Sequence, residues 1–539
     1  MNMMRFLLRS WTAAHTRALV HLSCAAVMCL ALPVNAADTP VLDVKRFVIE
    51  GDNPLSEAET QEILKPYLGP HSSLATLEDA ATALQAAVRD RGHSFHRVIV
   101  PAQQPSAGEL RLRVLPFVLD QVTVTGNRNF TAENIRRSMP GLKPGKSPDI
   151  RQLGQQLSLA NEHPSKRITL QIKEGTKPDA VDADLRVADT APSQFFVSLI
   201  GGTRDFDNTL NRNTGYTRLT VGYQHSNLFN RDHTATITYT TSPEKLSDVK
   251  QVGAFYTVPF YGYNTMLAAY YTHSDINSGT VGLGAQSFDV SGSGEFYGVK
   301  ATYLLPRLGE VVQNVSFAYD SRYFESNVAF GGTTLPTSAV GSRPITFRYA
   351  ARMEKDQAAY AGFAEYSRNL SGGRAGNDAD YAAARAGARS DWDAYRYGLD
   401  ATYSFAARWS VNGRLRGQYA NEALIPGEQI GIAGMTAVRG FREREVTGDK
   451  GYFVNLEVNG PPVFADLAPY LFVDFGGRTH VMPVIGASPN ENISSTGAGV
   501  RWKWQRLDVN LIYAHVLNGV AGGTPRDHDK LLFSGFYRF

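Results

Sequence analysis

The chain has 539 residues, more than one ordinary domain holds, and its net charge is only +3 at pH 7. This near balance of charge excludes the basic footprint of a nucleic-acid-binding protein. Phenylalanine and tyrosine are frequent, with 27 and 25 copies against 5 tryptophans, and 49 glycines accompany them. This mixture favours many short strands that are joined by tight turns.

The first 36 residues read as a secretory signal sequence. Arginines precede a mostly apolar run, residues 18–34, and residues 34–36 show the small-residue pattern of a cleavage site. A membrane anchor helix is the alternative, and His21 and Pro33 within the apolar run argue against it. We therefore expect the chain to be exported.

The cysteines support an exported, disulfide-free protein. Cys24 and Cys29 both lie inside the predicted signal, so the mature chain would contain no cysteine. That excludes a disulfide scaffold, a cysteine-ligated metal and a thiol nucleophile. No run of 18 apolar residues follows the signal, so a membrane-spanning role would need a barrel of strands.

A duplicated unit occupies the next part of the chain. Residues 47–56 and 122–131 align without gaps at a separation of 75, and each reads as a short strand, a glycine turn and a helix cap. Two helices and then two strands follow in both copies. The predicted helices are 56–67, 76–91, 132–139 and 149–161, and the predicted later strands include 95–100, 109–115 and 166–173.

The remainder, from about residue 190, consists of period-two strands that are apolar on one face and polar on the other. Leu219, Val221 and Tyr223 share one such face. In a soluble sheet the polar face would meet water, whereas in a membrane barrel the apolar face meets lipid and the polar face lines the lumen. The export signal, the aromatic content and the aromatic terminus at Tyr537 and Phe539 favour the membrane barrel. Its length suits about 16 strands.

A long connection at 421–450 carries the tetrapeptide Val438, Arg439, Gly440 and Phe441. A glycine-rich surface loop is the plain interpretation, but loops of this length between paired strands are usually functional.

A second motif follows the loop, at Phe472, Asp474 and Gly476. Phe472 and Asp474 are two residues apart and share a face, so a lumen-facing Asp474 would be a buried carboxylate in need of a partner. Arg439 is the natural partner, because a guanidinium and a carboxylate can pair through two parallel hydrogen bonds.

No catalytic constellation is visible. The Gly-X-Ser-X-Gly, zinc-protease and P-loop spacings are absent, and the 12 histidines are scattered without ligand spacing. We therefore expect no enzyme activity, no cofactor and no metal.

Together these features resemble the two-partner secretion transporters, the TpsB or haemolysin secretion/activation class of the POTRA-plus-barrel superfamily. The tetrapeptide resembles the family's sixth surface loop, which folds into the lumen, and the second motif resembles the inner-wall motif that meets the loop arginine. The resemblance implies a signal peptide at 1–36, POTRA domains at 37–116 and 117–189, and an outer-membrane β-barrel at 190–539 with a lumen-inserted loop at 421–450.

The resemblance also implies a function, which is secretion of one large β-helical exoprotein that arrives unfolded in the periplasm. The expected partners are that exoprotein, outer-membrane lipid and the barrel-assembly machinery that would read Tyr537 and Phe539, with no nucleic acid. POTRA domains would bind the exoprotein by adding its strand to a sheet edge. The expected contacts in the first domain are Phe95, Arg97 and Ile99 of the edge strand and Leu84 and Val88 of the adjoining helix.

Three alternatives stay open. An insertase of the same superfamily would usually carry more POTRA domains, a passive porin would lack periplasmic repeats, and an uptake receptor would carry a plug domain. One departure from the family is that no plug helix fits before the first POTRA strand, near Val44. The sequence leaves open which exoprotein is carried and whether secretion activates it.

Overall fold

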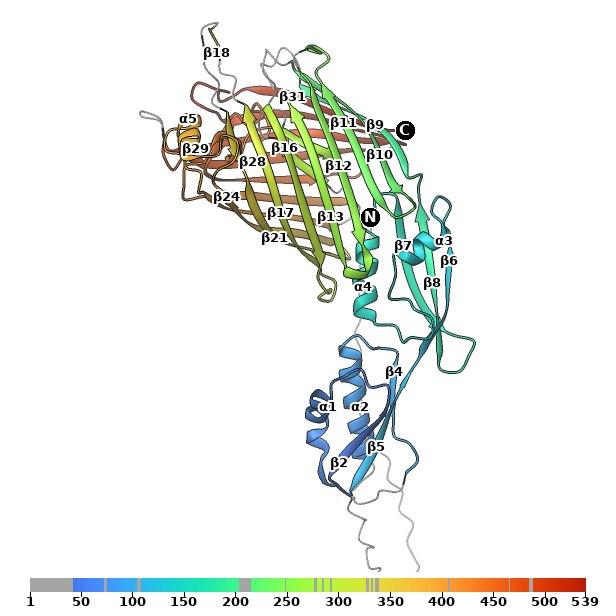
Figure 1. The fold of residues 1–539 in the computed structure, drawn as a ribbon. Coiled ribbons are helices and arrows are strands. Elements are labelled where there is room, and N and C mark those ends of the chain that lie inside the picture. The colour runs from blue at the N-terminus through green and yellow to red at the C-terminus, as the bar shows by residue number, and fades with distance from the viewer. Residues whose placement is uncertain are drawn as a thin grey trace, which may run out of the picture.

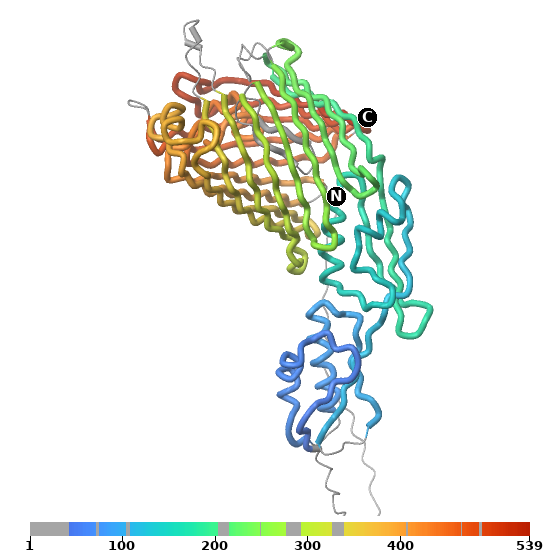
Figure 2. The backbone as a smooth tube through the Cα atoms, in the orientation of Figure 1, coloured from blue at the N-terminus to red at the C-terminus, as the bar shows by residue number. Residues whose placement is uncertain are grey.

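The computed structural model describes residues 42–539 apart from 72–74, 104–107, 203–214, 248, 276–278, 284–285, 291–292, 326–328, 331–332, 335–338, 406–407, 465 and 484–487. The predicted signal sequence, with both cysteines, and the region of a plug helix lie outside the described residues. Two α+β domains follow one another below one end of a large barrel (Figure 1). The tube in Figure 2 shows the same succession, from the blue first domain through the second domain to the barrel.

The first α+β domain folds around a three-stranded sheet. The central strand β5 (Glu109–Pro116) runs parallel to β2 (Arg46–Gly51) and antiparallel to the edge strand β4 (His96–Ile99). Leu110, Leu112 and Val114 of β5 are buried against the helices. The other elements are β1 (Leu42–Val44), which pairs with β3 (Gly69–His71), and the helices α1 (Glu57–Leu64), η1 (Lys65–Tyr67) and α2 (Ala75–Asp90).

The second α+β domain repeats this arrangement. Its central strand β8 (Ala180–Asp189) runs parallel to β6 (Val118–Thr125) and antiparallel to β7 (Lys166–Glu174). The helices are α3 (Ala132–Arg137) and α4 (Ile150–Ala160). Its hydrophobic core continues into the barrel, since Tyr261 and Leu304 belong to the same buried cluster as Leu153 and Leu185.

The element order of both copies agrees with the sequence prediction, and most bounds differ by one or two residues. One helix differs more. The predicted helix 56–67 ends its α-helical part at Leu64 and continues as the 3-10 turn η1, because Pro66 has no N–H for an α-helical bond. Ser56 and Thr131 cap their helices, with side chains that accept from the Glu59 and Asn134 N–H groups. No helix in the described part of the chain is long and apolar enough to cross a bilayer.

Within the described residues, sixteen antiparallel strands form a closed barrel. β20 and β21 are counted as one strand, because both are segments that pair with β17. The last strand, β31, pairs with the first, β9, from Leu532–Gly202 to Arg538–Phe196. The strands are β9 (Ser193–Gly202), β10 (Thr217–Leu228), β11 (His233–Thr241), β12 (Gln251–Phe260), β13 (Thr265–Ser274), β16 (Ser293–Leu304), β17 (Val312–Glu325), β20 (Val340–Ser342), β21 (Pro344–Lys355), β22 (Ala358–Asn369), β23 (Asp393–Phe405), β24 (Trp409–Tyr419), β27 (Lys450–Asn459), β28 (Leu467–Thr479), β29 (Asn490–Trp504), β30 (Leu507–Asn518) and β31 (Asp529–Arg538).

The connections between strands differ at the two ends of the barrel. Those next to the α+β domains are short, such as the turn between β10 and β11 and the 3-10 turn η2 (Tyr261–Tyr263). Those at the far end are long and hold the remaining elements: β14 (Gly279–Leu283) with β15 (Gln286–Val290), β18 (Ala329–Phe330) with β19 (Thr333–Thr334), α5 (Asp378–Ala384), η3 (Pro426–Glu428), and β25 (Ile430–Gly431) with β26 (Thr447–Gly448).

The outer face of the barrel is apolar. Ile237, Val299, Leu399, Leu456 and Leu511, from five different strands, are about half exposed. The inner face carries polar pairs, such as the hydroxyls of Thr220 and Thr240, 2.7 Å apart. A soluble protein does not surround itself with such a belt, whereas lipid covers it at no cost. The predicted membrane barrel of about 16 strands is therefore confirmed.

We predict that a charge on the outer face destabilises the barrel and that the same charge on the inner face does not. Leu399→Arg, at the middle of β23, should lower the free energy of unfolding by about 2–4 kcal/mol, because the guanidinium would face hydrocarbon. Thr402→Arg, on the lumen side of the same strand, is the control. The measurement is denaturant unfolding in liposomes, and equal effects of the two variants would contradict the assigned faces.

Candidate functional site

The connection between β24 and β27, residues 420–449, folds back into the barrel. Four of its side chains, Ile432, Val438, Phe441 and Val446, are almost fully buried. They form one hydrophobic cluster with wall residues, namely Phe453 of β27, Ile493 of β29 and Val516 of β30. The loop therefore packs on the inside of the wall rather than standing in solvent.

Arg439, at the inserted tip of this loop, forms a two-pronged ion pair with Asp474 of β28. Its Nε and Nη2 atoms donate to Oδ2 and Oδ1 of the carboxylate, both at 2.7 Å, and its backbone N–H donates to Oδ2 at 3.1 Å. The Asp474 side chain has no solvent exposure and that of Arg439 has 6%. The pair predicted from the sequence is thus present and buried in the lumen.

The carboxylate of Asp474 accepts a fourth hydrogen bond, from Asn455 Nδ2 at 2.8 Å. The same amide donates to the Ala437 carbonyl of the loop at 2.8 Å, so Asn455 holds the wall and the loop together. A carboxylate has about four acceptor positions, and those of Asp474 are all used. Its burial is therefore compensated only while the loop stays inserted.

Arg439 is bound on its remaining sides as well. Nη1 donates to Glu457 Oε1 of β27 at 2.7 Å, and Glu457 Oε2 accepts from Arg501 of β29 at 2.7 Å. The guanidinium carbon lies 3.5 Å from the centre of the Phe472 ring, a cation–π contact. Sequence reasoning missed Asn455 and Glu457. Both alternate with the apolar positions 454, 456 and 458. This alternation places them on the lumen side of the strand and could have indicated them.

Two glycines of the motifs give the loop room. Gly440 has φ +96°, a conformation that favours glycine, and a Cβ there would lie 3.0 Å from Val516. A Cβ on Gly476 of the wall would lie 3.0 Å from Val438 and 3.3 Å from Ile432. The glycines thus allow close contact between loop and wall.

Other contacts anchor the base of the loop. Glu428 is buried and accepts from Arg322 of β17 at 2.8 Å and from Arg396 of β23 at 3.4 Å. Asp449 pairs with Arg385, which follows α5, and Glu445 accepts from the Thr524 N–H in the connection between β30 and β31. The base of the loop is thus held from several sides by hydrogen bonds and ion pairs, all of them non-covalent.

In the first α+β domain the structure corrects part of the expected substrate site. Leu84 and Val88 have no exposed surface, because they form the face of α2 that packs on the sheet, so neither can contact a substrate directly. Arg97 is exposed and Ile99 half-buried, on the outer face of β4. Phe95 precedes that strand, and its carbonyl accepts hydrogen bonds from the Phe117 N–H and the Ser147 hydroxyl.

The outer edge of β4 carries a contact that the sequence did not reveal. The Val98 N–H donates to the side-chain carbonyl of Gln85 in α2 at 3.1 Å. An added strand would use this same N–H for its ladder, so the amide of Gln85 occupies a position on the edge that a bound peptide would need.

The predicted assembly residues lie at the barrel's seam. Tyr537 is in β31, and Phe539 follows it with its N–H donating to the Phe195 carbonyl at 2.9 Å. Their rings contact each other edge to face, with centroids 4.8 Å apart, and both are exposed on the outside. Among the described residues, no group of histidines and carboxylates has the arrangement of a metal site.

Comparisons with known proteins agree with this fold and site. The family model of the haemolysin secretion/activation proteins ShlB/FhaC/HecB matches residues 197–502, and that of the ShlB-type POTRA domain matches residues 42–116. The outer membrane transporter CdiB of Dickeya dadantii is 24% identical over 79% of this chain and 73% of its own length. The heme/hemopexin transporter protein HuxB of Haemophilus influenzae is 20% identical over 82% and 77%.

Solved structures show the same fold. CdiB from Escherichia coli superposes with a TM-score of 0.72 at 15% identity, over 95% of this chain and 93% of that one. CdiB from Acinetobacter baumannii gives a TM-score of 0.69 at 16% identity, over 93% and 90%. The family match covers more than half of the chain. The chain therefore belongs to the haemolysin secretion/activation family ShlB/FhaC/HecB, the outer-membrane transporters of two-partner secretion.

Proposed function

We propose that this chain binds one large unfolded exoprotein in the periplasm through its POTRA domains and passes it through the barrel to the cell surface. The observation that carries the proposal is the loop at 420–449, which packs on the inside of the barrel wall and is held there by non-covalent contacts, buried ion pairs among them. A lumen lined by polar strands and blocked by a removable segment suits a chain that passes in an extended, hydrated form.

The first α+β domain supports recognition of an unfolded chain. Its edge strand β4 has one neighbour, β5, among the described strands, and the outer face of β4 presents Arg97 and Ile99. Backbone pairing on an edge recognises extended peptides with little dependence on their sequence, and alternate side chains add selectivity. An exoprotein rich in β-structure, such as a β-helix, supplies strands of this kind.

The protein itself performs no chemical reaction in this proposal. The periplasm supplies no nucleotide, so folding of the exoprotein outside the cell would prevent its return and drive transport. Lipid surrounds the apolar belt, and the barrel-assembly machinery would insert the chain by its terminal aromatic strand. Cofactors and metals have no part in this mechanism.

We predict that deletion of residues 44–116 abolishes secretion and leaves the barrel folded, because the barrel strands make their own closed sheet. The test is co-expression with a candidate exoprotein from the genomic neighbourhood, read out as exoprotein in the medium per unit of transporter. Heat-modifiability of the barrel is the control for folding. Normal secretion by the deletion variant would contradict recognition by the first domain.

We predict that Arg439→Ala loosens the inserted loop and raises ion conductance through the barrel in planar lipid bilayers. Losing one partner of a buried ion pair costs about 3–5 kcal/mol, and water in the lumen reduces that figure. Arg439→Lys should give an intermediate conductance, because it keeps the charge and loses the two-pronged geometry. Arg414→Ala is the matched control, since this wall arginine pairs with Asp400 and both side chains are almost half exposed. Equal conductance of the unaltered protein and all three variants would show that the Arg439–Asp474 pair does not hold the loop.

We predict a definite order of secretion defects for the two partners. Asp474→Ala leaves Arg439 with Glu457, whereas Arg439→Ala leaves Asp474 buried without a cation, so the arginine variant should be the more severe. The double variant should secrete no less than Arg439→Ala, because one shared interaction cannot be lost twice. The measurement is secreted exoprotein per transporter, and additive defects would contradict a shared role.

We predict that Gln85→Ala strengthens exoprotein binding. The variant frees the Val98 N–H for an incoming strand, and one net hydrogen bond is worth about 0.5–1.5 kcal/mol, so the affinity gain should reach up to about tenfold. The measurement is binding of an N-terminal exoprotein fragment to the full-length transporter in detergent. Gln103→Ala, which removes a side-chain amide from the backbone of Arg111 in β5, is the matched control. Unchanged affinity in Gln85→Ala would place the binding edge elsewhere.

A further inference from the structure

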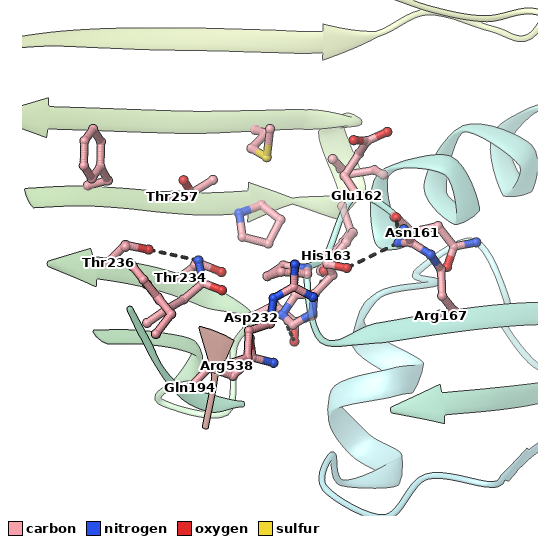
Figure 3. A pocket seen from close by; sticks show the side chains of 18 of the residues that line it. Asn161, Glu162, His163, Arg167, Gln194, Asp232, Thr234, Thr236, Thr257 and Arg538 are labelled. Atoms are coloured by element: carbon pink, nitrogen blue, oxygen red, sulfur yellow. Dashed lines mark hydrogen bonds and ion pairs between the residues drawn. The ribbon is translucent and has the colours of Figure 1, made fainter. Parts of the chain in front are cut away.

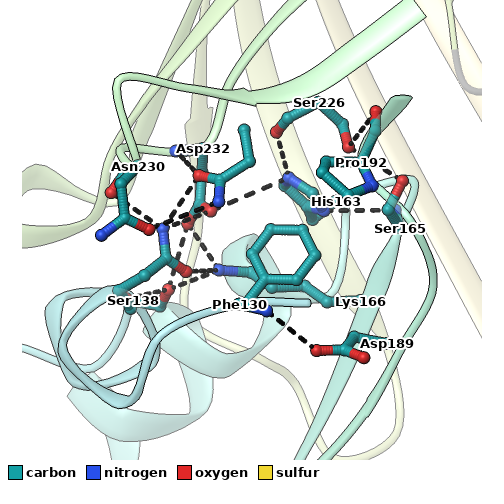
Figure 4. A network of polar contacts seen from close by, with 12 residues as sticks. Phe130, Ser138, His163, Ser165, Lys166, Asp189, Pro192, Ser226, Asn230 and Asp232 are labelled. Atoms are coloured by element: carbon teal, nitrogen blue, oxygen red, sulfur yellow. Dashed lines mark hydrogen bonds and ion pairs between the residues drawn. The ribbon is translucent and has the colours of Figure 1, made fainter. Parts of the chain in front are cut away.

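A buried polar joint links the second POTRA domain to the barrel, far from the inserted loop. Lys166 begins β7 in the POTRA domain, and Asp232 lies in the turn between β10 and β11. Their charged atoms are 2.5 Å apart, and the side chains are 0% and 1% exposed. Figure 4 shows the two side chains pointing toward each other between the domain and the turn.

Every polar atom of this ion pair has a partner. The Lys166 ammonium donates to Asn134 Oδ1 and Ser138 Oγ, both at 2.9 Å, as well as to Asp232. Asp232 also accepts from Asn134 Nδ2 at 2.8 Å and from the Tyr261 hydroxyl at 2.6 Å. Three donors of a lysine and both oxygens of an aspartate are thus satisfied, so the charges can remain buried.

The POTRA domain also contacts the backbone of the turn itself. Asn230 and Asp232 have positive φ values of 55° and 62°, which asparagine and aspartate tolerate. Asn134 Nδ2 lies 3.1 Å from the Asn230 carbonyl, and Arg137 donates to that same carbonyl at 2.8 Å. The joint therefore fits one particular turn shape.

A histidine extends the joint toward the start of the barrel. His163 Nδ1 accepts from the Ser165 N–H at 3.2 Å, so Nε2 carries the proton and donates to the Ser226 carbonyl at 2.6 Å. Burial, opposed by the Asp232 carboxylate and assisted by the Lys166 ammonium, lowers the pKa of His163 to about 4. The imidazole is thus a neutral hydrogen-bonding part of the joint at pH 7.

The joint borders a chamber of about 840 Å³ at the barrel mouth. The segment after α4 lies along one side, and its Glu162 pairs at 2.5 Å with Arg352 of β21 on the barrel wall. Uncharged polar side chains on the first barrel strands line the chamber, namely Gln194, Gln224, Thr234, Thr236 and Thr257. Figure 3 shows His163 and Asp232 at the same chamber.

We propose that Lys166 and Asp232 are positioning residues that fix the second POTRA domain on the β10–β11 turn and so keep this chamber open for the passing chain. Only the last part of this proposal, the open chamber for a passing chain, rests on the proposed secretion function. The position of the domain can be measured without any exoprotein, which separates the two ideas.

The experiment is a distance measurement between spin labels on the POTRA domain and on the barrel. The described residues contain no cysteine, so Gln171→Cys on β7 and Lys355→Cys on β21, both exposed, provide specific sites in the mature protein. Lys166→Met and Asp232→Asn should each broaden the single distance distribution, because each leaves one buried charge unpaired. Both should also reduce secretion while heat-modifiability of the barrel stays normal.

The double variant Lys166→Met/Asp232→Asn should regain a narrow distribution and most of the secretion. Neither charge remains, and the amide that replaces the carboxylate accepts from Asn134 Nδ2 through its oxygen and donates through its NH2 group to the Tyr261 oxygen. Arg167→Ala is the matched control, because this exposed neighbour donates only to carbonyls of its own domain, those of Asn161 and His163. Its distance distribution should equal that of the unaltered protein.

Two results would overturn the proposal. A narrow distribution in both single variants would show that the pair does not position the domain. A broad distribution with full secretion would show that the position does not serve transport. If a charge variant loses heat-modifiability, Tyr261→Phe removes a single hydrogen bond from Asp232 and must give a smaller broadening in the same direction.

Discussion

The inserted position of the loop at 420–449 depends on one carboxylate that has no access to water. The buried carboxylate of Asp474 is compensated because an arginine, a backbone N–H and an amide occupy all its acceptor positions. Three of those four bonds come from the loop residue Arg439. Insertion of the loop and compensation of the Asp474 carboxylate therefore occur together. Withdrawal of the loop would leave this buried charge to be solvated by water or by a passing chain.

Two of the buried ion pairs serve opposite needs in the proposed function. Arg439–Asp474 joins a loop to a wall from which the loop would separate during the proposed transport, and the pair continues to the more exposed side chains of Glu457 and Arg501. Lys166–Asp232 joins two units that we propose stay together, and the rings of Phe130 and Tyr261 lie beside the ammonium. The greater solvent access around Arg439 suits an ion pair that opens in the proposed transport, and the enclosed position of Lys166 suits one that stays formed.

Much of the fold and the central ion pair could be predicted from the sequence, because both leave periodic or local signals. Alternation of apolar and polar residues predicted the barrel, and the spacing of Phe472 and Asp474 placed the carboxylate on one face of a strand. The internal repeat predicted two similar domains with the same order of elements. Each of these inferences needs only neighbouring residues or a comparison of one segment with another.

The remaining features depend on contacts between segments that are distant in the chain. Lys166 and Asp232 are 66 residues apart, and nothing local distinguishes a buried lysine from a solvated one. Leu84 and Val88 were assigned to a binding surface because they lie on the helix beside the edge strand, yet the same stripe forms the domain's core. The capping of Val98 by Gln85 likewise follows from how the helix lies on the sheet.

The alternation in the barrel strands also determines how the chain travels before it folds. A segment is retained in the inner membrane when about 20 consecutive residues favour lipid, and a single central arginine or aspartate opposes that partition by roughly 2.5–3.5 kcal/mol. In β23, Arg396 and Asp400 stand among Tyr397, Leu399 and Ala401. Such a strand is too short and too polar to stop in the translocon, so the chain reaches the periplasm whole. Its apolar character emerges only when neighbouring strands align and place all the apolar side chains on one surface.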